Sequence, residues 1–293
     1  MNYKSYQDIS LACWNNLHRL PVAYDLIVGI PRSGMIPATM LSLYLNTNLS
    51  SLDAFLNGEI MDCGSTRVDR NRIFALAEVK NVLVVDDSID RGVSIREAKN
   101  KISSSAILRK YNLRIDYAAV YSSTGKDKDI MLSFETLPQP RCFQWNIFNH
   151  PRRTCTTCYD IDGIVCRDPT GLENDDGDNY KKFIRSAEKR LPIDFQVGAF
   201  VSSRLEKYRM ETTVWLHKNG YRFRELVLLD LPSKESRIKQ NAHASFKASV
   251  YKQRTETLFV ESEWKQAVEI ARLSGKDVFC TENMRYIKGG GAI

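Results

Sequence analysis

Residues 82–94 read VLVVDDSIDRGVS, and this stretch decides the fold of the first part of the chain. The apolar run Val82–Val85 is typical of a buried strand, and two carboxylates, Asp86 and Asp87, follow it directly. A short glycine-containing turn then leads into Ser94–Tyr111, which has helical periodicity. Paired acids at the carboxyl end of a strand lie where open α/β sheets bind their ligands.

The same alternation of strand and helix recurs along the chain and indicates parallel α/β sheets. The units fall into two clusters, one on each side of about residue 150. The predicted strands are Asp25–Ile30, Val82–Val85, Tyr117–Tyr121, Thr156–Ile161, Phe195–Val201, Leu226–Leu229, Thr257–Val260 and Asp277–Cys280. The predicted helices are Ser33–Leu45, Ser94–Tyr111, Arg204–Asn219 and Glu263–Ser274.

Chain length supports two domains, because single cores rarely grow beyond about 250–300 residues and this chain has 293. The segment Leu137–Cys155 contains three prolines and is a candidate junction. We therefore predict one domain over residues 1–150 and a second over residues 151–293.

Composition is that of a folded soluble protein, with 43% hydrophobic and 26% charged residues and no signal-peptide or membrane-span pattern. We expect a cytoplasmic protein whose seven cysteines are reduced thiols. The net charge of +7 comes without a run of like charge, which favours small polyanionic substrates over nucleic acid. A homodimer is the candidate assembly.

The turn after the acid pair has the chemistry of a phosphate site, because its backbone N–H groups and the following helix start can bind an anion. Two carboxylates beside such a turn suit a phosphorylated sugar with two free hydroxyls. This stretch resembles the signature of type I phosphoribosyltransferases. The resemblance implies that Asp86 and Asp87 hold the ribose hydroxyls of 5-phosphoribosyl 1-diphosphate, directly or through Mg²⁺. The residues it assigns to the substrate and its 5-phosphate are Ser88, Asp90, Arg91, Gly92, Val93 and Ser94.

A second loop supports the same resemblance. Residues 28–34 read VGIPRSG, end an earlier strand and enter a helix, as the diphosphate loop of that family does. The resemblance places Arg32 against the diphosphate, with Ser33 and Gly34 beside it. The polar stretch Gly64–Arg72 resembles in placement the mobile catalytic lid of the family.

Asp90 gives a clue to the acceptor. An aspartate three residues after the acid pair resembles the 6-oxopurine members, in which it contacts or deprotonates the base near N7. A purine acceptor is therefore expected. One departure from the family is Arg91, which stands where threonine is usual.

A second chemical site begins at residues 156–165, which read TTCYDIDGIV. Residues two apart on a strand face the same side, so Asp160 and Asp162 are predicted to converge on one phosphate and one Mg²⁺. The stretch resembles the first motif of the haloacid-dehalogenase (HAD) superfamily. That resemblance makes Asp160 the nucleophile that forms an aspartyl-phosphate and Asp162 the group that protonates the leaving oxygen and then activates water.

Later motifs of the HAD superfamily follow in order. Ser202 after the strand Phe195–Val201 resembles the phosphoryl-binding serine of the second motif, with Ser203 as the near alternative. Lys247, at the start of the helical-looking Lys247–Arg254, resembles the third-motif lysine. Its rivals are Lys252 and Lys234. The fourth-motif acids that complete the Mg²⁺ site correspond to Glu261 and, second to it, Glu263.

The sequence thus predicts two Rossmann-like α/β domains, a phosphoribosyltransferase-type parallel sheet followed by a HAD-like parallel sheet with a small cap. The predicted enzyme is bifunctional and Mg²⁺-dependent. It would transfer a phosphoribosyl group to a base and hydrolyse a phosphate monoester, with nucleobases or nucleotides as its small-molecule partners. The alternative is a regulatory or effector module that binds phosphoribosyl compounds or nucleotides with a degenerate catalytic site. Arg91 and Glu261 motivate this alternative hypothesis, because each departs from the residue that is usual in the family it resembles.

Overall fold

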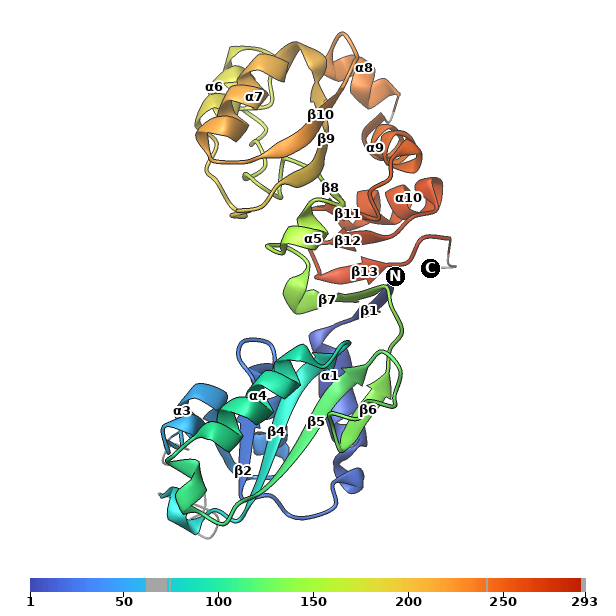
Figure 1. The fold of residues 1–293 in the computed structure, drawn as a ribbon. Coiled ribbons are helices and arrows are strands. Elements are labelled where there is room, and N and C mark those ends of the chain that lie inside the picture. The colour runs from blue at the N-terminus through green and yellow to red at the C-terminus, as the bar shows by residue number, and fades with distance from the viewer. Residues whose placement is uncertain (62–72, 74, 241, 291–293) are drawn as a thin grey trace. The chain divides into compact units, whose positions relative to one another are not determined.

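The computed structural model describes residues 1–61, 73, 75–240 and 242–290 and divides into two compact units. The N-terminal unit spans Asn2–Trp145, and the C-terminal unit spans Asn146–Ile293 together with Met1 (Figure 1). The division falls a few residues before the boundary predicted at residue 150. The reason is aromatic packing, because Trp145 stacks on Phe143 within the N-terminal unit, whereas Phe148 packs edge-on against Phe279 in the C-terminal unit.

The N-terminal unit is built on a five-stranded sheet in the order β3-β2-β4-β5-β6, and each neighbouring pair is parallel. A separate parallel pair joins β1 to β7. The strands are β1 (Asn2–Lys4), β2 (Leu26–Gly29), β3 (Asn48–Ser51), β4 (Asn81–Ile89), β5 (Arg114–Ser122), β6 (Leu132–Thr136) and β7 (Arg141–Phe143). The helices are α1 (Tyr6–Asn15), α2 (Met35–Tyr44), α3 (Leu52–Leu56) and α4 (Val93–Ser104), with 3₁₀ turns at Leu17–Arg19, Leu76–Glu78 and Leu108–Lys110.

Strand β4 is apolar on both faces because helices cover both sides of the sheet. Its alternate residues Leu83 and Val85 pack into a core shared with α1 and α2. Val82 and Val84 point into the opposite core, which α3 and α4 close. A parallel sheet covered in this way needs near-continuous apolar strands, which is why the run at 82–85 was a reliable signal.

The C-terminal unit contains a six-stranded sheet in the order β10-β9-β8-β11-β12-β13, parallel except for the pairing of β13 with β12 (Figure 1). The strands are β8 (Thr157–Tyr159), β9 (Val197–Leu205), β10 (Phe223–Leu229), β11 (Leu258–Glu261), β12 (Val278–Cys280) and β13 (Arg285–Ile287). The helices are α5 (Pro151–Thr154), α6 (Asp178–Ser186), α7 (Arg209–Lys218), α8 (Lys234–Lys239), α9 (Ala242–Gln253) and α10 (Trp264–Ser274), with a 3₁₀ turn at Glu206–Tyr208.

Small residues let α9 and α10 pack closely on one face of this sheet. Ala244 and Ala248 of α9 and Ala267 of α10 lie in one core cluster with Phe259 of β11. This packing brings the middle of α9 over the carboxyl ends of β8 and β11, where the candidate residues of the second site lie.

All eight predicted strands are present, but some bounds differ. The acid pair lies inside β4 rather than after it, because pairing with β5 continues as far as Ile89 opposite Ser122. Strand β9 likewise continues beyond Val201 to Leu205, and all nine of its residues are buried. The predicted parallel α/β architecture is confirmed for both sheets apart from the edge strand β13.

Two predicted helices begin or end elsewhere, and one candidate residue sits differently. The prediction that a helix starts at Arg204 is wrong, because Arg204 is a buried residue of β9 and α7 begins at Arg209. Helix α4 ends at Ser104 instead of continuing to Tyr111, since Ser105 is extended at its C-cap. Lys247 lies in the middle of α9 rather than at a helix start.

In the described residues, no helix has the length and apolar character needed to cross a membrane. The six cysteines in that part of the chain are free thiols.

Candidate functional site

A cavity of about 230 Å³ lies at the carboxyl end of β4 in the N-terminal unit. It brings one residue of the acid pair together with the predicted phosphate loop and with an arginine from β7. The residues that line it are Asp86, Ser88, Ile89, Asp90, Arg91, Gly92, Val93, Ser94, Ile95 and Arg141. Open α/β sheets bind ligands at this edge, so the placement suits a phosphorylated ligand.

The side chain of Arg96 fixes the loop after β4. Arg96 donates from Nη2 to the carbonyl oxygen of Arg91 at 2.7 Å and forms an ion pair with Asp129 at 2.5 Å. Gly92 has φ of +69°, and a Cβ atom there would lie 2.5 Å from Asp129 Oδ2. Glycine is therefore required at this position, both for the left-handed backbone and for space.

The two acids of the pair have different surroundings. Asp86 is 6% exposed, and burial together with the neighbouring Asp87 raises the pKa of its carboxyl from 3.8 to about 8. Asp87 accepts hydrogen bonds from Ser33 Oγ at 2.9 Å and from Trp145 Nε1 at 2.7 Å. Asp86 is thus a predominantly neutral carboxyl at neutral pH, whereas both oxygens of Asp87 are already engaged by the protein.

The predicted diphosphate loop meets the acid pair through Ser33. Gly34 makes the approach possible, because a Cβ atom there would lie 2.5 Å from the carbonyl oxygen of Ile30 and 2.8 Å from that of Val85. Arg32 is exposed and does not line the cavity. The predicted lid, Gly64–Arg72, lies outside the described residues.

Asp90 lies at the solvent side of the same cavity. It accepts a hydrogen bond from Ser123 Oγ at 2.6 Å, which is the main reason that the pKa of its carboxyl lies below the ordinary value. Arg141 donates to the carbonyl oxygen of Ile89 at 3.0 Å on the cavity wall. The loop therefore carries an ionised carboxylate close to a half-buried guanidinium.

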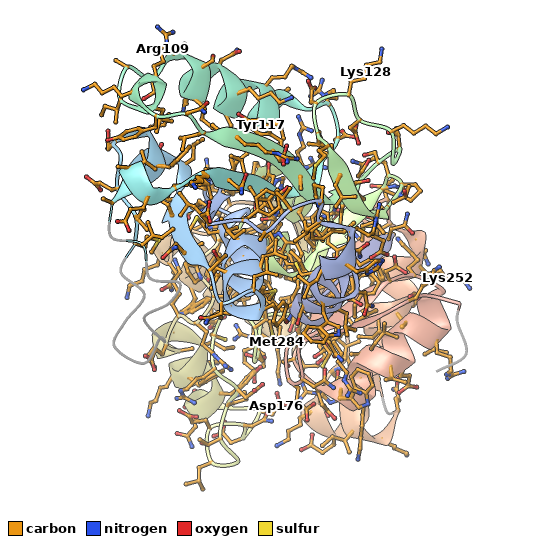
Figure 2. All side chains as sticks on the ribbon, turned by 90° about the horizontal axis from the view of Figure 1, so that it is seen from below. Arg109, Tyr117, Lys128, Asp176, Lys252 and Met284 are labelled. Atoms are coloured by element: carbon orange, nitrogen blue, oxygen red, sulfur yellow. The ribbon has the colours of Figure 1, made fainter. Side chains whose placement is uncertain are left out.

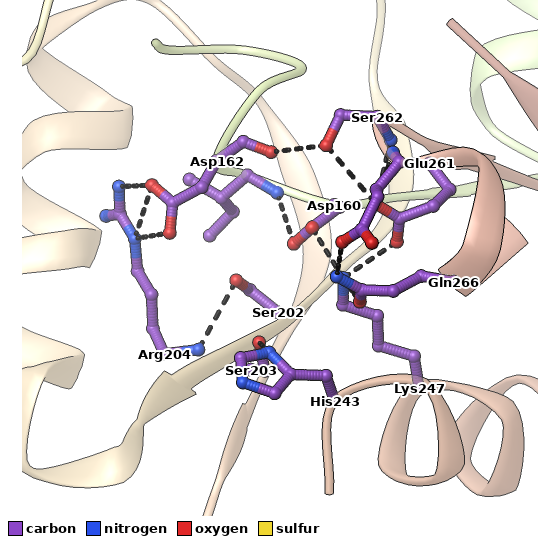
Figure 3. A network of polar contacts seen from close by, with 12 residues as sticks. Asp160, Asp162, Ser202, Ser203, Arg204, His243, Lys247, Glu261, Ser262 and Gln266 are labelled. Carbon is purple, nitrogen blue, oxygen red and sulfur yellow. Dashed lines mark hydrogen bonds and ion pairs between the residues drawn. The ribbon is translucent and has the colours of Figure 1, made fainter. Parts of the chain in front are cut away.

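The second candidate site lies at the carboxyl ends of β8 and β11 in the C-terminal unit (Figure 3). Lys247 of α9 reaches into it and donates from Nζ to Asp160 Oδ2 at 2.6 Å, to Glu261 Oε2 at 2.7 Å and to Gln266 Oε1 at 2.9 Å. A cavity of about 440 Å³ opens beside Asp160 and Lys247. Asp160, Glu261 and Gln266 thus all contact the ammonium group of Lys247.

Burial governs the protonation of this cluster. Lys247 is 1% exposed, and although burial opposes its charge, the carboxylates of Asp160 and Glu261 raise its pKa above the ordinary value. Burial also raises the pKa of Glu261, while Lys247 acts in the opposite direction. Lys247, Asp160 and Glu261 therefore form a buried cluster of ion pairs.

Asp162 faces a different cation from Asp160 (Figure 3). Its Oδ1 accepts from Arg204 Nη2 at 2.6 Å and its Oδ2 accepts from Arg204 Nε at 3.1 Å. The Arg204 side chain is fully buried. The two aspartates were predicted to converge on one ligand, but each is paired with its own buried cation, because β9 extends far enough to carry Arg204 beneath Asp162.

The two candidate serines of the second motif differ in access to the cavity. Ser202 Oγ accepts from the N–H of Arg204 at 3.4 Å and does not line the cavity. Ser203 lines it, and its Oγ lies 2.9 Å from His243 Nδ1. Burial lowers the pKa of His243, so this imidazole is neutral near pH 7. The alternative residue Ser203 is therefore the better placed of the two.

The rivals of Lys247 have other surroundings. Lys252 is exposed and points away from the body of the unit (Figure 2). Lys234 donates through its backbone N–H to Asp176 at 3.0 Å and through Nζ to the carbonyl oxygen of Asn174, so it holds the loop before α6.

Glu263, the second candidate fourth-motif acid, lines the cavity but accepts a hydrogen bond from Gln266 at 2.6 Å.

The donor set allows a test of Mg²⁺. Oxygens of Asp160 and Glu261 lie 2.6 Å and 2.7 Å from one position, that of Lys247 Nζ, so two carboxylates do face a single cation. Mg²⁺ commonly uses one or two protein carboxylates and completes its shell with water and phosphate. The described residues hold no group of three or more His, Cys, Asp or Glu side chains arranged for a metal. The point that the carboxylates of Asp160 and Glu261 share is occupied by Lys247 Nζ, so the metal roles of Asp160, Asp162 and Glu261 stay predictions.

Sequence reasoning missed several polar residues of both sites. Arg204 was assigned to a helix, and nothing in the spacing marked Trp145, Arg141, Arg237 or His243. Their positions depend on tertiary packing, since each comes from an element whose face toward the site is set by its neighbours. The one available signal was a charged residue, Arg204, two serines after the apolar run that ends at Val201.

Comparison with known proteins finds similarity to solved structures only. No protein-family model matches the sequence, and no curated protein matches it. Solved structures similar to about half of this chain include the xanthine-guanine-hypoxanthine phosphoribosyltransferase of Helicobacter pylori, at 18% identity and a TM-score of 0.34 over 49% of this chain and 92% of that one. Another is the purine phosphoribosyltransferase of Pyrococcus horikoshii, at 20% identity and a TM-score of 0.36 over 50% and 94%. The orotate phosphoribosyltransferase of Aeropyrum pernix matches at 19% identity and a TM-score of 0.29 over 45% and 71%. Likeness at this level carries no statement about the chemistry of this chain.

We predict that Asp86→Asn stabilises the protein at pH 8 and has little effect at pH 4. Folding raises the pKa of Asp86 to about 8, so the stability linked to its protonated form is fully present below pH 4 and is lost as the pH rises toward 8. Asparagine stays neutral and keeps the acceptor for the N–H of Asp87, which lies 2.9 Å away. The gain in unfolding free energy at pH 8 should be on the order of a few kcal/mol. Calorimetric melting at pH 4, 6 and 8 measures it.

The matched control is Glu97→Gln on the exposed face of α4, which should change the melting temperature equally at each pH. A loss of stability on Asp86→Asn at pH 8 would contradict the burial argument.

Proposed function

We propose that the N-terminal unit binds 5-phosphoribosyl 1-diphosphate and transfers its phosphoribosyl group to a base. The observation that carries this proposal is the cavity at the end of β4, in which the loop of residues 90–94 and Asp86 share one wall. Backbone N–H groups at such a turn and helix start suit the 5-phosphate. The carboxyls of Asp86 and Asp87 suit the ribose hydroxyls.

The proposed reaction forms a bond between a base nitrogen and C1 of ribose and breaks the bond from C1 to the diphosphate oxygen. The loop of Arg32 and Ser33 would hold the leaving diphosphate, and Asp90 would take the proton that the base releases. Mg²⁺, where bound, would supply charge neutralisation for the diphosphate. A purine acceptor is part of this proposal and rests on the position of Asp90.

We further propose that the C-terminal unit hydrolyses phosphate monoesters through an aspartyl-phosphate, in the manner of the HAD enzymes that its motifs resemble. Asp160 at the end of β8 supports this, because it lines an open cavity and is paired with the buried Lys247. An Asp160 oxygen would attack phosphorus while the ester bond breaks and the leaving alkoxide takes up a proton. Water would then attack the phosphorus of the acyl-phosphate, which returns the carboxylate and releases phosphate.

The proton donor in this scheme is the predicted role of Asp162. Both of its oxygens are engaged by Arg204, so the role requires that this ion pair opens when substrate binds. Lys247 would meanwhile exchange an Asp160 oxygen for a phosphoryl oxygen and hold the charge that develops there.

The two activities could act in sequence, since phosphoribosyl transfer makes a 5′-monophosphate and a phosphatase would remove that phosphate. A second candidate function is ligand binding without turnover in the N-terminal unit. The engagement of Asp87 by Ser33 and Trp145 favours this alternative, because it occupies oxygens that the ribose would need.

We predict that the double variant Asp86→Asn, Asp87→Asn loses binding of phosphoribosyl diphosphate by at least about 100-fold and leaves ester hydrolysis within about twofold. The acids lie in a separate unit from Asp160, so the two activities should be independent. Calorimetric titration and diphosphate release with a panel of bases measure the first effect. Glu97→Gln is the control. Binding without diphosphate release for any base would favour the effector alternative, and equal loss of both activities in a folded variant would contradict the separation.

We predict that Asp160→Asn folds but lowers phosphatase turnover by at least about 1,000-fold, since an amide cannot form the acyl-phosphate. Beryllium fluoride with Mg²⁺ should raise the melting temperature of the wild type and not of the variant. The exposed Asp178→Asn is the control and should behave as the wild type. A wild type that neither responds to the fluoride nor hydrolyses any of a series of sugar and nucleoside monophosphates would sink the phosphatase assignment.

A further inference from the structure

The cavity beside Asp160 contains a buried arginine that the proposed reaction does not use. Arg237 comes from α8, is 7% exposed and lines the cavity together with Ser203, His243 and Tyr180. It donates from Nη1 to the carbonyl oxygen of Ser203 at 2.8 Å, and its Nε is buried without a hydrogen-bond partner. In the part of the chain that the structure describes, the bond to Ser203 is the only hydrogen bond that this guanidinium donates, so most of its donor capacity is unused there.

The other two buried cations of the site each have a carboxylate partner. Arg204 is paired with Asp162, and Lys247 is paired with Asp160 and Glu261. Arg237 forms no ion pair with any carboxylate in the part of the chain that the structure describes. Burying a charge without a counter-charge opposes folding, so proteins rarely keep one unless a ligand supplies the partner.

Arg237 and Lys247 are anchored to different residues of the cavity wall. Lys247 already supplies a cation at Asp160, where a phosphoryl group would be transferred. Arg237 is anchored instead to the backbone of Ser203, and Asn174 and Tyr180 from the region around α6 line the same cavity. A volume of about 440 Å³ has room for a small-molecule ligand well beyond one phosphate group.

We propose that Arg237 binds a second anionic group of the substrate, a phosphate or a carboxylate, and that the C-terminal site therefore selects phosphomonoesters that carry such a group. This inference rests on the proposed phosphatase function and specifies its substrate class. Arg237 is a planar donor fork, which suits bidentate binding of either anion. Besides burial, the charges of both Arg237 and Lys247 lower the pKa of His243, while those of Asp160 and Glu263 raise it.

The test uses three six-carbon sugar phosphates: glucose 6-phosphate, glucose 1,6-bisphosphate and the open-chain acid 6-phosphogluconate. The full chain carries Asp86→Asn and Asp87→Asn so that the first site does not contribute. Dissociation constants are measured by calorimetry without metal, and kcat/KM is measured with Mg²⁺. Arg237→Gln is compared with Lys239→Gln, an exposed residue of the same helix, and with Arg237→Lys, which keeps the charge and loses the fork.

We expect the parent protein to prefer at least one doubly anionic ligand over glucose 6-phosphate by about 30- to 100-fold. Arg237→Gln should abolish that preference, Arg237→Lys should retain part of it, and Lys239→Gln should retain it in full. Preference for the bisphosphate alone or for the phosphogluconate alone identifies the second anion as phosphate or carboxylate.

Two results would overturn the proposal: equal loss of affinity for all three ligands, which would assign Arg237 to the transferred phosphoryl group, or no change on Arg237→Gln. Melting without ligand distinguishes a ligand-binding role of Arg237 from a structural one. The proposal predicts that Arg237→Gln has a melting temperature equal to or above that of the parent protein. A large decrease in melting temperature would show that Arg237 is needed for packing. A preference that is seen in binding without any hydrolysis would refute the phosphatase and leave the role of Arg237 standing.

Discussion

Parallel strand pairing is the constraint on which both candidate sites depend. Strands joined by crossover helices run in one direction, so their carboxyl ends and the loops that follow gather at one edge of the sheet. In the N-terminal unit, β2 and β4 are neighbours, and Ser33 after the first therefore reaches Asp87 in the second. In the C-terminal unit, the pairing of β8 with β11 places Asp160 and Glu261 where one lysine can contact both.

Buried charge then gives each edge its chemical character. The N-terminal site concentrates acid, and burial makes Asp86 a weak one, so the site is poised to gain negative charge when a cation or a hydrogen-bonding sugar arrives. The C-terminal site contains three buried cations, Lys247, Arg204 and Arg237, beside several carboxylates. Lys247 and Arg204 are paired within the protein, and Arg237 is left for a ligand. Burying charge opposes folding, and a bound ligand of opposite charge would offset part of that effect.

Sequence reasoning located the strands because buried parallel strands are nearly continuous apolar runs. It missed β1, β3, β6, β7 and β13. Of these, β3 and β6 are the edge strands of the five-stranded sheet, and most of their residues are polar or half-buried. It located Asp86, Asp160 and Lys247 because strand ends fix where such groups lie. The hydrogen-bond partners of these groups could not be predicted from the sequence. The extension of β9 that buries Arg204 depends on pairing with β10. The contact of Trp145 with Asp87 depends on the fold of the whole unit.

The central claim is that the two units carry separate anion sites, one at the loop of residues 90–94 and one at Asp160. Hydrogen exchange read by mass spectrometry tests this directly, with the full chain exposed in turn to phosphoribosyl diphosphate and to beryllium fluoride, each with Mg²⁺. We predict that the first ligand slows exchange at residues 86–95 and not at 160–166, and that the second slows exchange at 160–166 and not at 86–95. Protection of the same segment by both ligands, or of neither segment by either, would contradict the account.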